Sequence, residues 1–455
     1  MSRVVLTGHV DLLESFFILK EYTNYLHKTS RCFILLAIRK YVAGRTHGHK
    51  AGYVLQKINC EAPRPQGGAS RARSGEQNVS KGNFILIVPL ATAYRRDLRS
   101  TCRSEGGVMV MENKIREKAL KLGYEDCGII RVAALAGYRE KLEERISRIP
   151  MGEKIYGRYR SYADPSADNP EIKSIIVAIV PTYRYNVPSE FNGVYGKAYM
   201  FDGRTDEQAP FFSIRREFST FLESLGLTCM LGNSFGIPAP ARWAAYQAGL
   251  GIIRQNNFFY TKNGSYNHIE MFAVDRELEL IRDVKLKECS KDCNKCIGAC
   301  PTHTLSAPYT MSMIGCASFQ TSISANTGMA VPSPEMAEQI GCRLYGCDVC
   351  QDVCPFNKGK WTGGEDFPGL EALAPSMRPE SIMEMSYDEI GRTLAPKYWY
   401  IKPENLWKWK LNALTVMMNG CSEKYEAPIK LGLEDPNETV RNFTRGVCSK
   451  LGISF

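Results

Sequence analysis

The stretches CSKDCNKCIGACP (residues 289–301) and GCDVCQDVCPFN (residues 346–357) decide the fold of this chain. Each contains cysteines spaced C-x2-C-x3-C, and in each the last cysteine precedes a proline. Short spacings place several thiolates on one tight turn, which an iron–sulfur cubane requires. Residues 284–360 are therefore predicted to form a ferredoxin-like domain with two [4Fe–4S] clusters.

The Cys-Pro ends predict how the ligands divide between the clusters, because in two-cluster ferredoxins the cysteine before proline binds the other cluster. One cluster is assigned to Cys289, Cys293, Cys296 and Cys354, and the second to Cys300, Cys316, Cys347 and Cys350. The first step is C-x3-C, so Cys289 is the least regular ligand and Cys342 is its alternative. A zinc site with four cysteine ligands is the other interpretation of such spacing.

The composition is that of a protein outside the membrane. The chain has 455 residues, 44% of them hydrophobic and 23% charged, with a mean hydropathy of −0.26. The longest apolar runs, such as Leu12–Leu19, fall short of the ~20 residues that span a bilayer. Clustered thiols without a secretory signal favour a reducing compartment. We therefore expect a cytoplasmic protein with no membrane partner.

The net charge of +10 lies in the first quarter of the chain. Residues 1–110 contain 17 of the 58 basic and 7 of the 48 acidic residues, so the remainder is neutral. Residues 61–82 are rich in Pro, Gly, Ser and Arg, which is typical of a disordered linker. The run SEGGVMVM (residues 104–111) resembles a translated ribosome-binding site followed by start codons. Residues 1–108 are thus predicted to be a non-native or disordered extension, the alternative being a genuine basic extension.

The rest of the chain is predicted to be α+β, with an α/β cofactor domain over residues 111–283. The β-branched run at 174–180 predicts a buried strand, and helices are expected at 113–122, 213–225 and 239–248. Residues 365–455 predict a HEAT-like helical tail, with helices at 407–418, 427–433 and 439–451. In this tail Trp407 and Trp409 are expected to turn inward and Lys408 and Lys410 to face solvent; stacking of the tryptophans on RNA is the alternative.

The cysteine array resembles that of the epoxyqueuosine reductase family. GCRLYGCDVCQDVCPFN (residues 341–357) is similar to the family's I-G-x-R-x-Y-G-C-D-x-C-Q-x-V-C-P-W-N. CASFQT (residues 316–321) is similar to the family's C-I-S-Y-L-T, and AGLG (residues 248–251) matches the family's A-G-L-G. The likeness extends from about Met111 to the end of the chain and is most specific after Cys289.

This resemblance implies an oxidoreductase of queuosine-tRNA maturation that reduces an epoxide to an alkene. It implies cobalamin beside the two clusters, a carboxylic acid that donates a proton, and an external low-potential electron donor. Ser318, Asp348, Gly264 and Ser265 would line the corrin pocket. The resemblance makes tRNA a partner, although the neutral charge of residues 111–455 does not support it.

The chain departs from the family at the expected proton donor. Alignment on the AGLG glycines puts Phe235 where the family has aspartate, and Ala241 replaces a glutamate. The family's G-K-N is Arg254-Gln255-Asn256 here. Phe235 has no acidic proton, so another acid is needed; Tyr246, Tyr260 and Tyr266 are nearby in sequence and are otherwise ordinary packing residues.

The leading hypothesis is a diverged, cobalamin-dependent, epoxyqueuosine-reductase-like enzyme, with its substrate left open. One alternative is a reductive dehalogenase-like corrinoid reductase. The other is a two-cluster electron-transfer protein without corrin. The altered region at Phe235 favours the alternatives, whereas the cysteine block at 316–357 and the helical tail favour the family.

Overall fold

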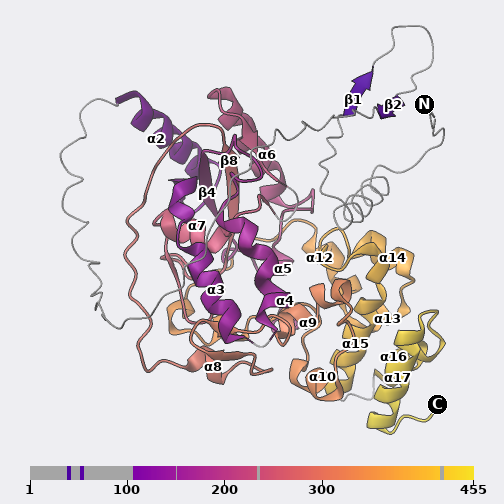
Figure 1. Cartoon of the computed structure of the whole chain (residues 1–455). Helices are drawn as coiled ribbons and strands as arrows, with labels where there is room; N and C mark the ends of the chain where they lie inside the picture. The colour runs from indigo at the N-terminus through magenta and orange to yellow at the C-terminus, as the bar shows by residue number, and fades with distance from the viewer. Residues whose placement is uncertain (1–37, 42–51, 56–105, 150, 233–235, 421–424) are drawn as a thin grey trace, which may run out of the picture. The chain divides into compact units, whose positions relative to one another are not determined.

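The computed structural model describes residues 38–41, 52–55, 106–149, 151–232, 236–420 and 425–455 (Figure 1). The chain divides into two compact units, Met1–Tyr94 and Arg95–Phe455. In the first unit, strands β1 (Ile38–Tyr41) and β2 (Gly52–Leu55) form an antiparallel pair. The prediction for residues 1–108 falls almost entirely outside the described residues and stays a prediction.

The second unit contains a four-stranded antiparallel sheet in the order β3-β4-β8-β5. Its strands are β3 (Cys127–Arg131), β4 (Ser174–Pro181), β8 (Asn267–Val274) and β5 (Cys229–Met230). Every residue of β4 is buried. This confirms the strand predicted from the β-branched run, and both of its faces are covered by helices.

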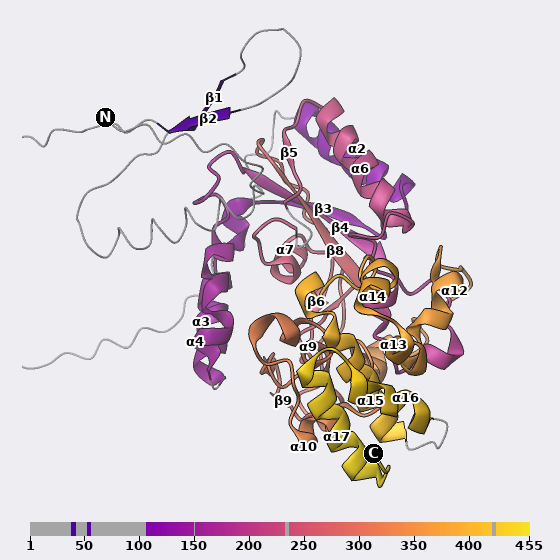
Figure 2. The ribbon, with the colours of Figure 1, turned by 90° about the vertical axis from the view of Figure 1, so that its right-hand side faces the viewer.

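The two faces of the sheet carry separate hydrophobic cores (Figure 2). On one face Ile176 belongs to a core with residues of helices α2 (Gly106–Lys121) and α6 (Pro210–Ser224). On the other face Ile175 belongs to a core with residues of α7 (Ala241–Gln247). The predicted helices at 113–122, 213–225 and 239–248 are thereby confirmed, with small shifts of their ends.

Shorter elements connect this layer and extend it. They are η1 (Val132–Leu135), α3 (Tyr138–Arg148), α4 (Gly152–Tyr156), η2 (Gly157–Ala163), η3 (Ser189–Phe191), α5 (Lys197–Met200), β6 (Ile252–Ile253) and β7 (Phe259–Tyr260). Strands β6 and β7 form a hairpin whose loop, residues 254–258, reaches the cysteine-rich part of the chain.

The cysteine-rich part consists of short helices and one small hairpin. Its elements are α8 (Lys295–Gly298), β9 (Leu305–Ala307), β10 (Thr310–Met311), α9 (Ala317–Gln320), η4 (Ile323–Thr327), α10 (Pro334–Ile340), α11 (Val349–Asp352) and η5 (Pro355–Asn357). Helices α8 and α11 contact one another. Each carries the middle cysteine of one C-x2-C-x3-C-P run, so the two runs form a related pair.

The C-terminal part is helical, as predicted. It contains α12 (Leu370–Leu373), η6 (Ala374–Met377), α13 (Pro379–Glu384), α14 (Tyr387–Thr393), η7 (Pro403–Asn405), α15 (Trp407–Gly420), α16 (Glu426–Leu431), η9 (Gly432–Glu434) and α17 (Glu438–Leu451). Its core includes Met200 of α5 and Tyr195, which lies just before α5, so the tail packs on the rest of the unit.

One expectation for this tail is wrong. Trp409 is buried as expected, but Lys408 and Lys410 are buried as well, at 1% and 8% exposure. Lys408 donates a hydrogen bond to the Ala330 carbonyl, and Lys410 pairs with Asp435. Both faces of α15 are covered, so its lysines lie inside the core.

None of the helices in the described ranges could cross a bilayer.

Candidate functional site

The first group of predicted ligands surrounds one small cavity. Its lining includes four cysteines: Cys289, Cys293, Cys296 and Cys354. The loop of the β6–β7 hairpin, with Arg254 at its start, forms part of the wall. Cys342, the alternative to Cys289, is exposed and is not among the lining residues.

The second group lies around Cys350. Burial raises the pKa of the Cys350 thiol, and the charges of Cys347, Cys316 and Cys300 raise it further. The three cysteines exert this effect because they are close neighbours. The fold therefore brings together the two sets of four that the Cys-Pro rule predicts, with Cys300 and Cys354 exchanged between the runs.

The chemistry of these donors fits iron–sulfur clusters. Burial raises the pKa of Cys296 and of Cys347 to about 11 each, and neighbouring thiolates add to the effect. Buried thiols of this kind ionise at neutral pH only beside positive charge, and the thiolate is the form that binds metal. In the part of the chain that the structure describes, no three Cys, His, Asp or Glu side chains converge enough to hold a single metal ion. A cubane binds one thiolate on each iron, and each of the two sets offers four cysteines.

The hairpin loop connects the two sets. Asn256 Nδ2 donates hydrogen bonds of 3.0 Å to the Cys350 carbonyl and 2.9 Å to the Tyr260 hydroxyl. Arg254 Nη1 lies 3.7 Å from Cys289 Sγ. One loop of the sheet-containing region thus contacts both sets of cysteines.

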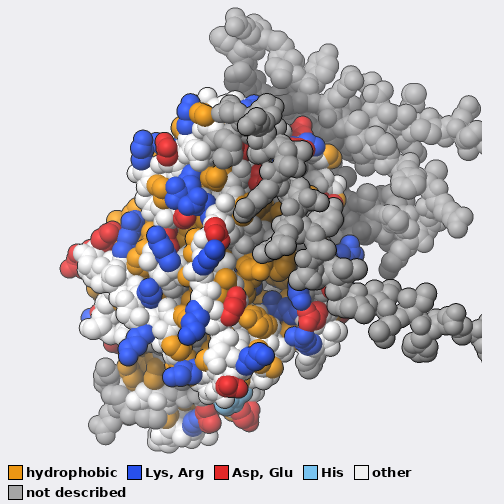
Figure 3. All heavy atoms as spheres, turned by 90° about the vertical axis from the view of Figure 1, so that its left-hand side faces the viewer, with side chains coloured by type: hydrophobic (Ala, Val, Ile, Leu, Met, Phe, Trp, Pro, Cys, Tyr) orange, Lys and Arg blue, Asp and Glu red, His pale blue; other side chains and the backbone are white. Residues whose placement is uncertain are grey.

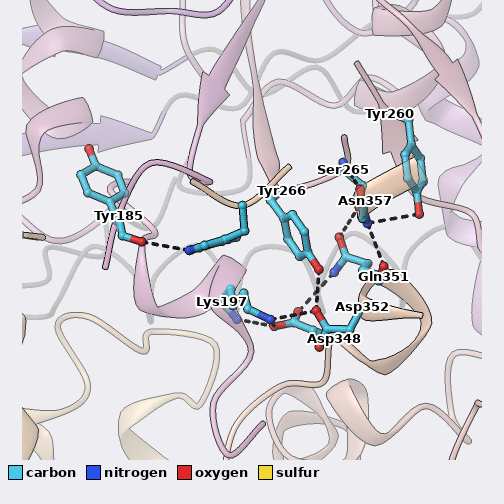
Figure 4. Close-up of polar contacts among 10 residues, drawn as sticks. Tyr185, Lys197, Tyr260, Ser265, Tyr266, Asp348, Gln351, Asp352 and Asn357 are labelled. Atoms are coloured by element: carbon cyan, nitrogen blue, oxygen red, sulfur yellow. Dashed lines mark hydrogen bonds and ion pairs between the residues drawn. The ribbon is translucent and has the colours of Figure 1, made fainter. Parts of the chain in front are cut away.

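Beside the second set lies a buried polar network that joins α5 to α11 (Figure 4). Asp348 accepts a hydrogen bond of 2.7 Å from the Lys197 backbone nitrogen and one of 3.2 Å from Gln351. Lys197 Nζ lies 2.8 Å from Asp352, which also accepts a hydrogen bond of 2.5 Å from the Tyr266 hydroxyl. One ammonium group is therefore shared by two carboxylates.

The network continues to the segment after β7. Ser265 Oγ donates to Gln351 at 2.8 Å, and Asn357 Nδ2 donates to Ser265 Oγ at 2.8 Å. Gly264 has a φ of 94°, and a Cβ at this position would lie 2.6 Å from Asn357 Oδ1. Glycine is therefore required here by both the backbone conformation and the close approach.

The structure brings together three of the four residues predicted to line a corrin pocket: Gly264, Ser265 and Asp348. The fourth, Ser318, shares a hydrogen bond of 2.7 Å with the Tyr199 hydroxyl, and Tyr199 belongs to α5 like Lys197. The side chains of Ser265, Asp348 and Ser318 are thus already paired within the protein. Ser265 and Asp348 are buried, whereas Ser318 is partly exposed.

A cavity of about 200 Å³ adjoins Ser265. Its walls include Asp202, Arg204, His268 and Glu270, with Phe211, Phe258 and Phe259. This volume is below the ~300–1,000 Å³ of ordinary small-molecule pockets, and a corrin needs more. Burial raises the pKa of Glu270 to about 7, and the Tyr124 hydroxyl donates a hydrogen bond of 2.5 Å to its carboxylate. Glu270 can therefore hold a proton near neutral pH.

The residues considered for proton donation are dispersed. Phe235 lies outside the described residues. Tyr246 is exposed, whereas Tyr260 and Tyr266 are buried and engaged by Asn256 and Asp352. Burial and the hydrogen bond to Asp352 raise the pKa of Tyr266, which makes it a poor general acid.

Sequence reasoning missed Lys197, Gln351, Asp352, Asn357 and Glu270. Gln351, Asp352 and Asn357 lie inside the quoted cysteine stretch, so their position between the ligands was an available signal. Lys197 and Glu270 become neighbours of the site only through long-range packing, and no local pattern distinguishes them.

Comparison with known proteins gives a consistent result. Residues 288–357 match the family model of the 4Fe-4S double cluster binding domain. The epoxyqueuosine reductase of Cellulophaga algicola is 29% identical over 253 residues, which are 54% of this chain and 78% of that protein. The epoxyqueuosine reductase of Bacillus subtilis is 37% identical over 140 residues, which cover 30% of this chain and only 32% of that protein.

A solved structure shares the fold. The crystal structure of an epoxyqueuosine reductase with an epoxyqueuosine-modified tRNA-Tyr stem loop aligns with a TM-score of 0.59 at 22% identity. The alignment covers 76% of this chain and 91% of that one. The chain therefore has the same overall fold from the sheet to the C-terminal helices, and the predicted α+β class is confirmed.

Proposed function

The chain belongs to the epoxyqueuosine reductase family, and from this premise we propose that it is an iron–sulfur oxidoreductase that reduces epoxyqueuosine in tRNA. The observation that carries the proposal is the arrangement of eight cysteines in two interlocked sets against the α5–α11 network. We place one cluster on Cys289, Cys293, Cys296 and Cys354, and the other on Cys300, Cys316, Cys347 and Cys350. Bound there, the clusters supply one-electron transfer at low potential.

The proposed reaction fixes what the protein must provide. Reduction of an epoxide to an alkene consumes two electrons and two protons and releases one water. The electrons come from an external low-potential donor. The described residues supply a place to hold a proton, since Glu270 has a pKa near 7 and lines the cavity beside Ser265. We propose that Glu270 is the acid that donates a proton to the substrate, a role that Phe235 cannot perform.

The tRNA partner rests on the relatives rather than on net charge. A relative has been solved with a modified tRNA stem loop. Figure 3 shows one face of this protein on which Lys and Arg side chains are spread among hydrophobic, neutral and a smaller number of acidic ones. Such side chains can contact phosphates and position an RNA without reading its bases. We propose this mode of binding, in the cytoplasm, where clustered thiols stay reduced.

Single-turnover conversion tests the function. Anaerobically reconstituted protein is mixed, with and without added cobalamin, with an epoxyqueuosine-containing tRNA stem loop and a low-potential reductant, and queuosine is measured by mass spectrometry. Conversion by the wild type and its loss in Cys350→Ser support the proposal. No conversion by protein that holds both clusters would contradict it.

A second candidate function is electron transfer without corrin, and the closed arrangement of Ser265, Asp348 and Ser318 favours it. The side chains of these three residues are engaged by Gln351, the Lys197 backbone and Tyr199. Titration of the cluster-loaded protein with cobalamin separates the candidates. A base-off cob(II)alamin spectrum supports the reductase with cobalamin, and unchanged spectra support the electron-transfer protein.

A further inference from the structure

Arg254 is an unusual arginine, because its guanidinium group is buried and has no acidic partner. The residue is 2% exposed. Among the described residues no carboxylate lies within ion-pair distance of it, and its Nε has no hydrogen-bond partner. A buried charge is costly unless something compensates it. The position therefore calls for a negative group nearby.

The geometry around Arg254 identifies that group. Nη1 lies 3.7 Å from Cys289 Sγ, and Nη2 donates a hydrogen bond of 2.8 Å to the Lys287 carbonyl. The guanidinium plane covers Phe356 at 3.4 Å from the ring centroid, and Phe356 follows the Cys354-Pro355 end of the other run. Arg254 is thus clamped between both segments that contribute the first set of cysteines, and it lines their cavity.

We propose that Arg254 is a positioning residue that raises the reduction potential of the cluster held by Cys289, Cys293, Cys296 and Cys354. This inference rests on the proposed cluster assignment. Four thiolates and a cubane form an anion that gains one more negative charge on reduction, and a fixed cation stabilises the reduced form more than the oxidised form. Net charge and hydrogen bonds to the sulfurs are established determinants of cluster potential.

The second set of cysteines receives a different contact from the same loop. Asn256, which is neutral, donates to the Cys350 carbonyl. The loop therefore places a positive charge beside one cluster only, which makes the reduction potentials of the two clusters differ. The family resemblance places glycine where this chain has Arg254, so the device belongs to this chain rather than to the shared motif.

The test is an EPR-monitored redox titration of the full chain with both clusters, comparing wild type, Arg254→Gln and Arg254→Lys. Glutamine keeps an N–H donor without charge, and lysine keeps the charge without the planar fork. In Arg254→Gln we expect the equilibrium constant for reduction of the first cluster to fall at least tenfold, which lowers its reduction potential by 59 mV or more for one electron. Arg254→Lys should stay near wild type, and the second cluster, identified by its loss in Cys350→Ser, should not move.

The inference would be overturned if the Arg254→Gln protein, with its full iron content, had the reduction potentials of the wild type. It would also be overturned if Arg254→Gln and Arg254→Lys shifted the potential of the first cluster equally. If Arg254→Gln does not retain the first cluster, Arg254→Lys decides, and a shifted potential there overturns the inference. Wild-type protein that never accepts two clusters would instead contradict the proposed function itself.

Discussion

The backbone nitrogen of Lys197 donates a hydrogen bond of 2.7 Å to Oδ2 of Asp348, 151 positions later in the chain. The Lys197 ammonium group adds an ion pair of 2.8 Å to Asp352. Helix α5, from the segment between β4 and α6, is thereby attached to the helix that carries Cys350. This attachment holds the second set of cysteines against the sheet-containing region.

Asp348→Asn should destabilise the protein, because it removes one of the two acidic partners of the buried Lys197. Breaking a buried pair completely costs about 3–5 kcal/mol. Lys197 keeps Asp352, so we expect a smaller loss of about 1–3 kcal/mol in anaerobic urea unfolding. Glu365→Gln is the matched control, since it removes a more exposed pair with Arg184, and we expect about 0–1 kcal/mol. Equal effects of the two changes would contradict the importance of the network.

Cys350→Ser should lower the iron content by about half, since one of two clusters loses a thiolate ligand. Iron and sulfide analysis of anaerobically purified protein measures the change. Cys342→Ser is the control, because Cys342 is exposed and outside both sets. Unchanged iron in Cys350→Ser, or a loss of iron in Cys342→Ser, would require a different ligand assignment.

The local chemistry of the chain was predictable from its sequence. Cysteine spacing alone grouped Cys300 with Cys350 and Cys354 with Cys296, and the fold brings these groups together. The β-branched run predicted strand β4 because residues buried on both faces must all be apolar.

Long-range relationships were not predictable. Lys197 and Asp348 meet only after the sheet and the cysteine-rich part have packed, and nothing in the local pattern of either residue indicates the other. The same holds for Arg254, which only the hairpin brings to Cys289. Lys408 was expected in solvent, because helical periodicity cannot tell that neighbouring segments cover both faces of α15.

Lys408 should make stability rise with pH in the alkaline range. Burial lowers the pKa of Lys408 to about 7, whereas an unfolded lysine has a pKa of about 10.4. Between these values the unfolded chain binds more protons than the folded chain, so the free energy of unfolding rises with pH by up to about 1.4 kcal/mol per pH unit. This gain in stability is lost again as the pH falls toward 7. Lys408→Met should remove this contribution, so its advantage over wild type is greatest near pH 7.

Urea unfolding between pH 7 and 10 checks this prediction, and the difference between variant and wild type cancels other titrating groups. Lys410→Met is the control, since Lys410 pairs with Asp435 at 3.0 Å and its loss should destabilise the protein. A difference curve for Lys408→Met that is flat with pH would contradict the prediction.

Glu270→Gln should slow epoxide reduction by about 10²-fold and change its pH dependence, if Glu270 donates a proton. In the wild type the rate should fall as pH rises through about 7, because the acid form of Glu270 is lost there. Besides Tyr124, the charged groups that act on this carboxyl are Arg215, Arg204 and Asp202. Tyr124→Phe is informative, because the Tyr124 hydrogen bond stabilises the carboxylate. Its removal should move the fall to higher pH. A wild-type rate and profile in Glu270→Gln would exclude Glu270 as the acid.

Phe235→Asp should raise epoxyqueuosine reduction if the missing acid limits the reaction. The family resemblance places the proton-donating aspartate at this position, and a positioned general acid contributes about 10²–10⁴-fold. Phe235→Asn is the matched control, because it has nearly the same shape and polarity but no acidic proton. Single-turnover rates of queuosine formation should increase for aspartate and not for asparagine. An equal gain in both would mean that removing the phenyl ring opened the site, and no gain in either would mean that Glu270 or another group already supplies the proton.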